Sequence, residues 1–447
     1  MEGNIKRILL VGFLSIFGSS TLYAQNPMVA DVGMADPHIR IFNNKAYLFA
    51  THDADPNAKK FTMPDWKIWS SDNLRDWVLE RTILPSKTYM GKSDNCWAPD
   101  AVYKNDMYYF YFSNGNVNTG VMSSKSPVGP YTDALGKPLL TEDMTTTKEY
   151  DPTVLIEDDG RGTAYIAFGH HRANDPDLFF AIAKLGEDMI TLAEAPKEIK
   201  IIGEGEVLAG NDKPTLHKRN GVYYLSAGSH YATATNIYGP YTRRGNSGND
   251  EFGLNSRAHG NYFSWNNQWF HTWCHFHLGK EVARFRESYI TYLHYKDNGE
   301  MVDDVGFLDE HFATGVGKYD ASWDKIEAEW YMAADNVEKR ENGKGGFEIQ
   351  QIKHGAYLYY PNVENIDKAA SITFNMSSDM GGTIEVRADS LTGAVLGTVE
   401  IPHAEGWKNY KTVNIPLSKT KEVKDVYLIF KGVGGNLFSL DWFKFEE

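Results

Sequence analysis

The chain has 447 residues, 42% of them hydrophobic and 23% charged, which is the balance of a soluble protein with more than one globular domain. Its formal net charge of −14 argues against nucleic acid or an anionic membrane as a partner and leaves neutral or cationic ligands. The aromatic content of 13% favours strands, and flat aromatic faces also suit sugar rings.

Residues 1–24 have the pattern of a secretory signal peptide. Lys6 and Arg7 give a positive start, and small residues lead to a cleavage site after Ala24. The apolar run between them, residues 8–17, is too short to span a bilayer. We therefore expect an exported protein, periplasmic or secreted, with no membrane span.

The sequence contains two cysteines, Cys96 and Cys274. In an exported chain two cysteines can form a disulfide, and two buried free thiols are the alternative. Nothing in the sequence fixes the distance between them, so both states stay open at this point.

One sequence pattern occurs five times before residue 272. Each copy has a short polar head with Pro or Gly, two apolar residues, a turn with Asn or Gly and an aromatic-rich strand, as in a β-hairpin. The copies are 35–49, 98–111, 150–167, 212–225 and 258–271. Their spacing is near the length of a four-stranded blade and helical periodicity is nearly absent, so the sequence predicts an all-β, five-bladed β-propeller.

In a propeller, the first strand of each blade lines a central channel, so residues at one repeat position converge at one end of it. Here those positions are Asp36, Asp100, Asp151, Asp212 and His259. A single aspartate of this kind commonly caps a turn, but four in one register are costly to bury without a purpose. Two carboxyl groups can hydrolyse a glycosidic bond, whereas several hard oxygen ligands also suit Ca²⁺.

The pattern changes after Gly299. Residues 305–322 lack clear periodicity and are expected to form a connector that follows the propeller domain, residues 25–304, in the chain. Short alternating runs with Gly, Asp and Asn turns then fill residues 323–447, which predicts a β-sandwich (jelly-roll) domain. The runs are 356–360, 371–374, 383–387 and 425–430.

The heads A-D-P-H-I, W-A-P-D, Y-D-P-T-V and A-H-G resemble glycoside hydrolase family 43, over roughly residues 27–304. The resemblance implies an inverting glycosidase in which Asp36 is the general base that activates water and Asp151 tunes and orients the acid. The acid is normally a Glu in an E-x-P context. Here that position is Asp212, one methylene shorter, and Glu206 in the preceding loop is the alternative.

Further residues are candidates for substrate and channel contacts. In related sequences an arginine at the place of Arg286 contacts substrate, and the resemblance implies that role here. Asp100 and Trp97 are candidate substrate contacts, with core packing the alternative for the tryptophan. His259 matches a histidine that faces a central Ca²⁺ or water cluster, with a role in filling the channel as the alternative.

The motif I-E-A-E at residue 326 and the closing motif S-L-D-W-F resemble carbohydrate-binding module family 6. The resemblance implies a structural Ca²⁺ held by Glu327, Glu329 and Asp441. It also implies a sugar site that contains Trp407 and a tyrosine from residues 357–360.

One position of this module departs from the family pattern. The asparagine usually found two residues before the final D-W-F is Ser439 here. Loss of that amide donor leaves a mainly structural role for the module open.

Taken together, the motifs predict an exo-acting α-L-arabinofuranosidase or β-xylosidase that acts on plant polysaccharide or oligosaccharides. The choice of a pentose comes from the resemblance. A β-galactofuranosidase is the enzymatic alternative, because furanoses share their shape. A carbohydrate-binding protein that has lost its general acid is the non-catalytic alternative, which Asp212 keeps open. Structural Ca²⁺ is expected, and no organic cofactor.

Overall fold

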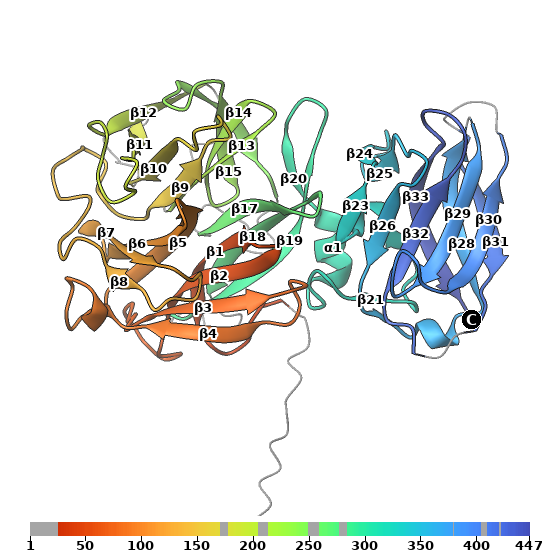
Figure 1. The fold of residues 1–447 in the computed structure, drawn as a ribbon, viewed down its shortest axis with the longest axis horizontal. Helices are drawn as coiled ribbons and strands as arrows, with labels where there is room; N and C mark the ends of the chain where they lie inside the picture. Colours follow the sequence, from red (N-terminus) through yellow and green to blue (C-terminus); the bar gives the residue numbers. More distant parts are fainter. Residues whose placement is uncertain are drawn as a thin grey trace, which may run out of the picture.

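The computed structural model describes residues 26–169, 178–203, 213–248, 259–276, 284–378, 380–403, 409–419 and 422–447. The signal peptide expected over residues 1–24 lies outside the described residues, and so do Asp212, Glu206 and Trp407. Figure 1 shows two β-rich bodies side by side, with helix α1 (Val305–His311) between them.

The larger, N-terminal body is mostly strand, with one short 3-10 helix, η1 (Pro85–Lys87), after β4. Its strands are β1 (Met34–Phe42), β2 (Lys45–His52), β3 (Trp66–Ser71), β4 (Val78–Ile83), β5 (Cys96–Lys104), β6 (Met107–Asn114), β7 (Asn118–Ser124), β8 (Thr132–Asp133), β9 (Thr153–Ile156), β10 (Ala164–Phe168), β11 (Leu178–Lys184), β12 (Lys197–Ile202), β13 (Pro214–Arg219), β14 (Val222–Ala227), β15 (His230–Ala234), β16 (Tyr241–Asn246), β17 (Gly260–Trp265), β18 (Gln268–Phe276), β19 (Arg286–Tyr295) and β20 (Met301–Asp303).

These strands group in consecutive fours. β1–β4, β5–β8 and β17–β20 each form a four-stranded sheet, whereas β9–β12 and β13–β16 are joined into one eight-stranded sheet by the parallel pair β12 and β16. The first strands contact one another in a cycle: β1 with β5, β5 with β9, β9 with β13, β13 with β17, and β17 with β1. Strands that close on themselves in this way form a β-propeller with a channel at its axis.

The predicted hairpins are present, and their turns explain why the sequence signal was clear. Asn43 and Asn44, between β1 and β2, have φ of 50° and 57°, and two positive φ values define the type I′ turn of a two-residue hairpin. Asn-Asp, Asn-Gly and Asn-Asn pairs connect β5 to β6, β13 to β14 and β17 to β18 with the same signs. Asparagine and glycine tolerate this conformation better than other residues.

The smaller, C-terminal body is also mostly strand. Its elements are β21 (Tyr319–Asp320), β22 (Ile326–Glu327), η3 (Ala328–Trp330), β23 (Ala333–Asp335), β24 (Glu338–Glu341), β25 (Phe347–Gln350), β26 (Tyr357–Tyr360), β27 (Val363–Glu364), η4 (Ile366–Lys368), β28 (Ser371–Ser378), β29 (Gly382–Ala388), β30 (Val395–Ile401), β31 (Lys411–Pro416), β32 (Val426–Lys431) and β33 (Phe438–Glu446).

Two sheets form this domain, one in the order β24-β25-β33-β28-β31 with β22 beside β33, the other in the order β23-β26-β32-β29-β30. Phe374 and Phe443 from the first sheet and Val386 and Leu428 from the second belong to one buried apolar cluster. The sheets therefore enclose a common core, which is the layered arrangement of a β-sandwich. The four runs predicted from the sequence coincide with β26, β28, β29 and β32.

Residues 305–322, expected to form a connector, contain helix α1 and strand β21, which pairs with β27 of the C-terminal domain. Asp304 links the two domains. Its carboxylate accepts hydrogen bonds from Phe307 N at 2.8 Å, as the N-cap of α1, from His294 Nε2 at 2.8 Å and from Trp330 Nε1 at 2.6 Å. The buried apolar cluster also runs across both domains, so they pack as one unit.

Two expectations concern the whole chain, namely the state of the two cysteines and the absence of a membrane span. Cys96 and Cys274 are both buried and free, so the disulfide alternative is wrong. Among the described residues, no helix has the length and apolar character needed to cross a membrane.

We predict that Asp304→Ala lowers the free energy of unfolding by about 3 kcal/mol, because three buried donors lose their acceptor. Burial alone would raise the pKa of Asp304, but the hydrogen bonds from His294, Phe307 N and Trp330 outweigh it and lower that pKa below its ordinary value of 3.8. The stabilisation is therefore complete above that value and is lost as the pH falls through the lowered pKa.

Urea denaturation of the wild type and the variant at several pH values measures this difference. Asp309→Ala, at an exposed position of the same helix, is the control and should change stability by less than about 0.5 kcal/mol. Equal stability of the Asp304 variant and the wild type at neutral pH would contradict the role assigned to Asp304.

Candidate active site

The head aspartates lie where the inner strands bend. The pairing of β1 with β2 shifts between Ala35 and His38, and that of β5 with β6 shifts between Trp97 and Asp100. Bulges of this kind re-aim side chains next to active sites. Asp36 itself has φ of 51°, a left-handed conformation that aspartate tolerates better than most residues.

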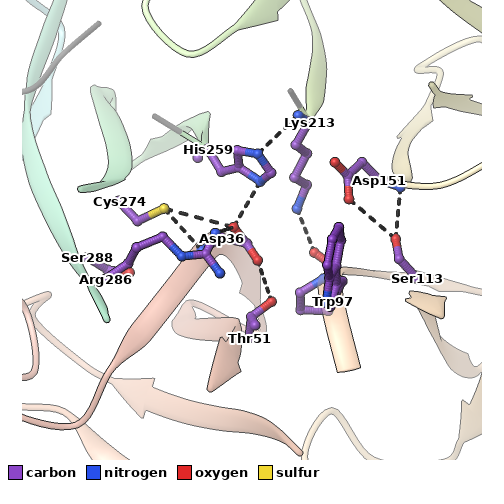
Figure 2. Close-up of polar contacts among 12 residues, drawn as sticks. Asp36, Thr51, Trp97, Ser113, Asp151, Lys213, His259, Cys274, Arg286 and Ser288 are labelled. Carbon is purple, nitrogen blue, oxygen red and sulfur yellow. Dashed lines mark hydrogen bonds and ion pairs between the residues drawn. The ribbon is translucent and has the colours of Figure 1, made fainter. Parts of the chain in front are cut away.

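Asp36 is 2% exposed and surrounded by donors. Its Oδ1 accepts a hydrogen bond from Arg286 Nη1 at 2.7 Å and lies 2.9 Å from His259 Nδ1. Its Oδ2 accepts from the Thr51 hydroxyl at 2.5 Å. Figure 2 shows these groups converging on the carboxylate, with the Cys274 thiol beside it.

These partners decide the charge of Asp36. Burial alone would raise the pKa of a carboxyl group. Arg286 and His259, together with the hydrogen bonds from His259 and Thr51, outweigh that effect and hold the pKa of Asp36 well below its usual range. Asp36 is therefore a carboxylate at any ordinary working pH, as a group that accepts a proton from water requires.

Arg286 is held in turn by Asp53. Its Nε and its backbone N donate to Asp53 Oδ2, each at 2.9 Å, and its Nη2 donates to Asp53 Oδ1 at 3.0 Å. The two-pronged contact fixes the plane of the guanidinium group, so that Nη1 points at Asp36. The guanidinium carbon also lies 4.8 Å from the centre of the Phe61 ring. The candidate substrate arginine is thus buried between two carboxylates.

Asp151 precedes β9 and lies on the other side of the Lys213 side chain from Asp36 (Figure 2). It is 1% exposed and, like Asp36, has a left-handed backbone, with φ of 58°. Its backbone N donates to the Ser113 hydroxyl at 2.8 Å, and that hydroxyl is 3.5 Å from Asp151 Oδ1. Trp97 is partly exposed nearby, with its ring 6.4 Å from that of Tyr150, whereas Trp66 is fully buried core.

Asp100 is fully buried. Arg40 donates to both of its oxygens, at 2.9 and 2.7 Å, and the backbone N atoms of Ala101 and Val154 donate at 2.6 and 2.7 Å. His38 Nε2 lies 3.1 Å from its Oδ1. These contacts give Asp100 a structural part in the channel, as the ion-pair partner of Arg40.

Sequence reasoning missed several residues of the pocket, chiefly Thr51, Asp53 and Lys213. Thr51 lies at the end of β2, the second strand of the first hairpin, and Asp53 directly follows it, whereas the acidic residues were expected at the heads of the first strands. Lys213 immediately follows a predicted head position, and it is 1% exposed. The sequence signal that could have found Lys213 is a charged residue directly after a channel-lining head position.

The structure brings together two of the three candidate Ca²⁺ ligands of the C-terminal domain. Glu327 and Glu329 line a cavity of about 300 Å³ between the domains, and Glu327 forms an ion pair with Lys325. Asp441 lies apart from that lining and accepts a hydrogen bond from Asn342 Nδ2 at 3.1 Å. Within the described ranges, no three His, Cys, Asp or Glu side chains are arranged to hold a metal ion.

Among the tyrosines expected to bind sugar, Tyr360 is fully buried, whereas Tyr357 and Tyr359 are partly exposed. The ring of Tyr359 is stacked on that of Tyr427 with centroids 4.5 Å apart. Ser439 is 3% exposed.

Comparison with known proteins agrees with this architecture. The family model "Glycosyl hydrolases family 43" matches residues 24–301, more than half of the chain. The chain belongs to glycosyl hydrolase family 43. A second model, "Carbohydrate binding module (family 6)", matches residues 327–447. The protein is therefore a family 43 glycosidase with a C-terminal family 6 module.

Curated relatives cover most of this family 43 chain. It is 25% identical to an arabinoxylan arabinofuranohydrolase of Bacillus subtilis (strain 168), over 98% of each protein. It is 27% identical to one of Paenibacillus polymyxa, over 94% of this chain and 74% of that protein. A β-D-galactofuranosidase of Aspergillus niger is 30% identical over 60% of this chain and 81% of that protein.

A solved structure also resembles the whole chain. It is a family 43 arabinoxylan arabinofuranohydrolase from Bacillus subtilis in complex with cellotetraose, with a TM-score of 0.58 and 23% identity. The match covers 94% of this chain and 97% of that one, and it supports the fold of both domains together.

We predict that Asp53→Asn lowers the free energy of unfolding by about 3 kcal/mol, because a buried guanidinium group loses its charged partner. The glycosidase kcat/KM should fall at least about tenfold, since Arg286 is no longer held against Asp36. Thermal unfolding and steady-state kinetics measure the two effects.

Asp55→Asn, two residues further on and exposed, is the matched control and should change neither quantity appreciably. If Asp53→Asn behaved like this control, the ion-pair chain would not be what orients Arg286.

Proposed function

We propose that this chain is an inverting, exo-acting glycosidase that releases α-L-arabinofuranose or β-xylose from plant polysaccharide or its oligosaccharides. The observation that carries the proposal is Asp36: a buried carboxylate, kept ionised by Arg286, His259 and Thr51, at the head of the first inner strand of a family 43 chain. The arabinoxylan arabinofuranohydrolases among its relatives support the choice of a pentose.

In the proposed reaction, Asp36 takes a proton from a water molecule as the water oxygen attacks the anomeric carbon. The bond to the leaving sugar oxygen breaks at the same time, and a general acid protonates that oxygen. The attack comes from the face opposite the leaving group, so the anomeric configuration inverts. We assign the acid to Asp212, with Glu206 as the alternative, and we propose that Asp151 raises the acid's pKa and orients it.

Arg286 and Trp97 are proposed to contact the sugar in this pocket. A guanidinium group donates several hydrogen bonds in a fixed plane, and a partly exposed indole offers an apolar face to a sugar ring. A β-galactofuranosidase is the second candidate, favoured by the relative from Aspergillus niger.

The larger domain is proposed to have five blades. The two halves of the eight-stranded sheet, β9–β12 and β13–β16, then count as separate blades, which agrees with the cycle of contacts among five inner strands. We further propose domain limits at 25–304 and 323–447, a jelly-roll topology for the second domain, and removal of residues 1–24 during export.

The C-terminal module is proposed to bind carbohydrate through Trp407 and a tyrosine of β26. Tyr357 and Tyr359 are the tyrosines of that strand with exposed surface, which supports one of them as the partner. The serine at position 439 removes an amide donor, so weak binding is expected.

A structural Ca²⁺ held by Glu327, Glu329 and Asp441 is also proposed. Burial, together with the charges of nearby carboxylates, raises the pKa of both glutamates, and a cation would relieve both effects. Glu329 Oε2 is buried and has no hydrogen-bond partner among the described residues. Asp441 would have to turn away from Asn342 to join the two glutamates.

Assaying the full-length protein on nitrophenyl arabinofuranoside, xyloside and galactofuranoside tests the proposed function. We expect the highest kcat/KM on a pentoside, and a loss of at least about 10³-fold in Asp36→Asn, because the base that activates water is gone. Activity on the galactofuranoside alone would favour the second candidate. Full activity of Asp36→Asn would refute the proposed base.

The same assay assigns the acid. We expect Asp212→Asn to lose activity on substrates with a poor leaving group, while Glu206→Gln keeps it, because only the former removes the proton donor. The reverse result would transfer the assignment to Glu206. A protein inactive on every glycoside, in which sugar binding nevertheless persists, would point to the non-catalytic alternative.

Chelation tests the proposed Ca²⁺. Dialysis against a chelator should lower the Tm of the full-length protein by about 5 °C, since a ligand bound only to the folded state stabilises it. Added Ca²⁺ should restore the Tm, and Glu329→Gln should abolish the response, whereas the exposed Glu338→Gln should retain it. An unchanged Tm after chelation would contradict the proposal.

A further inference from the structure

A buried lysine crosses the propeller channel. Lys213 precedes β13, is 1% exposed, and extends across the axis, where its Nζ donates a hydrogen bond to Pro99 O of β5 at 2.7 Å. Figure 2 shows its side chain lying between Asp36 on one side and Asp151 on the other. Its backbone N donates to His259 Nε2 at 3.4 Å.

Carboxylates lie close to the buried amine of Lys213. Burial has the largest effect and lowers the pKa of the amine below its ordinary value, and the negative charges of Asp100, Asp36 and Asp151 offset part of that effect. Several carboxylates buried around one channel repel one another and need a cation among them. Arg40 and Arg286 pair with Asp100 and Asp36 from the channel wall, and Lys213 supplies the charge on the axis.

The channel residues do not fit a metal ion at this place. His259 was the candidate ligand, but its Nδ1 faces Asp36 Oδ1 at 2.9 Å and its Nε2 accepts from Lys213 N. Both ring nitrogens therefore lie close to protein atoms, Nδ1 at ion-pair distance and Nε2 as a hydrogen-bond acceptor, whereas a neutral imidazole needs a lone pair directed at the metal to bind it.

We propose that the Lys213 ammonium is the resident cation of the channel in place of a metal ion, and that it positions the carboxylates of the catalytic pocket. It does so from within the chain, by connecting the head of β5 through Pro99 with His259 and hence with Asp36. Lys213 is in this view a positioning residue and donates no proton to substrate.

Metal content tests, without reference to activity, whether Lys213 takes the place of a metal ion in the channel. The full-length double variant Glu327→Gln, Asp441→Asn removes the carboxylates proposed for the C-terminal Ca²⁺. After equilibration with Ca²⁺ and removal of the excess, we expect no bound Ca²⁺ per chain by elemental analysis and no binding heat by calorimetry. One tightly bound Ca²⁺ in this variant that a further His259→Gln change abolishes would place a metal in the channel and overturn the proposal.

Kinetics test whether Lys213 positions the carboxylates, a role that rests on the proposed function. Lys213→Met keeps the length of the side chain without its charge, and we expect kcat to fall about 30-fold with KM changed less than about threefold. Added ethylammonium should raise the kcat of Lys213→Ala at least about tenfold, because it replaces the missing ammonium group. A purely structural role of Lys213 would not allow this recovery.

Lys218→Met, in β13 at a partly exposed position, is the control and should keep kcat within about twofold. Unchanged kcat in Lys213→Met, or no recovery with ethylammonium in a Lys213→Ala protein that folds normally, would overturn the positioning role. If the wild type hydrolyses none of the glycosides, the proposed function fails, while the metal count still decides which cation occupies the channel.

Discussion

The candidate active site depends on the compensation of buried negative charge. Asp36 and Asp53 share one guanidinium group, that of Arg286, through three hydrogen bonds of 2.7 to 3.0 Å. Removing ionised carboxylates from water is costly unless each meets a charged donor in good geometry. Because Arg286 satisfies both, Asp36 remains ionised in a place where burial alone would have neutralised it.

This constraint joins residues from distant parts of the chain. Arg286 lies at the start of β19, whereas Asp36 lies near the start of β1 and Asp53 directly follows β2, both at the open end of the first hairpin. The last blade-like sheet is therefore connected to the first by charge as well as by packing, at the point where the ring closes. The bulge in β1 turns the Asp36 side chain toward these donors. The fold that brings the inner strands together also supplies the partners that keep Asp36 charged.

Repeat register was the part of the fold that sequence predicted well. Two-residue turns such as Asn43-Asn44 have a strong local cause, a positive φ at both positions, and four of the five hairpins carry that signal. Asp36 and Asp151 could likewise be placed, because identical repeat positions converge at one end of a channel. Arg286 was expected to touch substrate, but its pairing with Asp53 was not foreseen, since nothing local joins residues 233 positions apart.

Other features lay beyond sequence reasoning for a similar physical reason. Helix α1 has seven residues, too few for a clear apolar period, and it is defined by its Asp304 cap and by packing between two domains. Asp100 shares a register with Asp36, yet Arg40 draws it into the channel wall. The role of a head residue thus depends on which cation reaches it, which the repeat alone does not specify.

The central claim is that Asp36 acts as a base on water and forms no bond to the sugar. Proton NMR of the sugar released in the first minutes of hydrolysis tests this most directly, since the two anomers have distinct signals before mutarotation. We predict that the first anomer formed from an α-L-arabinofuranoside is the β-anomer. First appearance of the α-anomer would mean retention, and a carboxylate that attacks carbon would then replace the base described above.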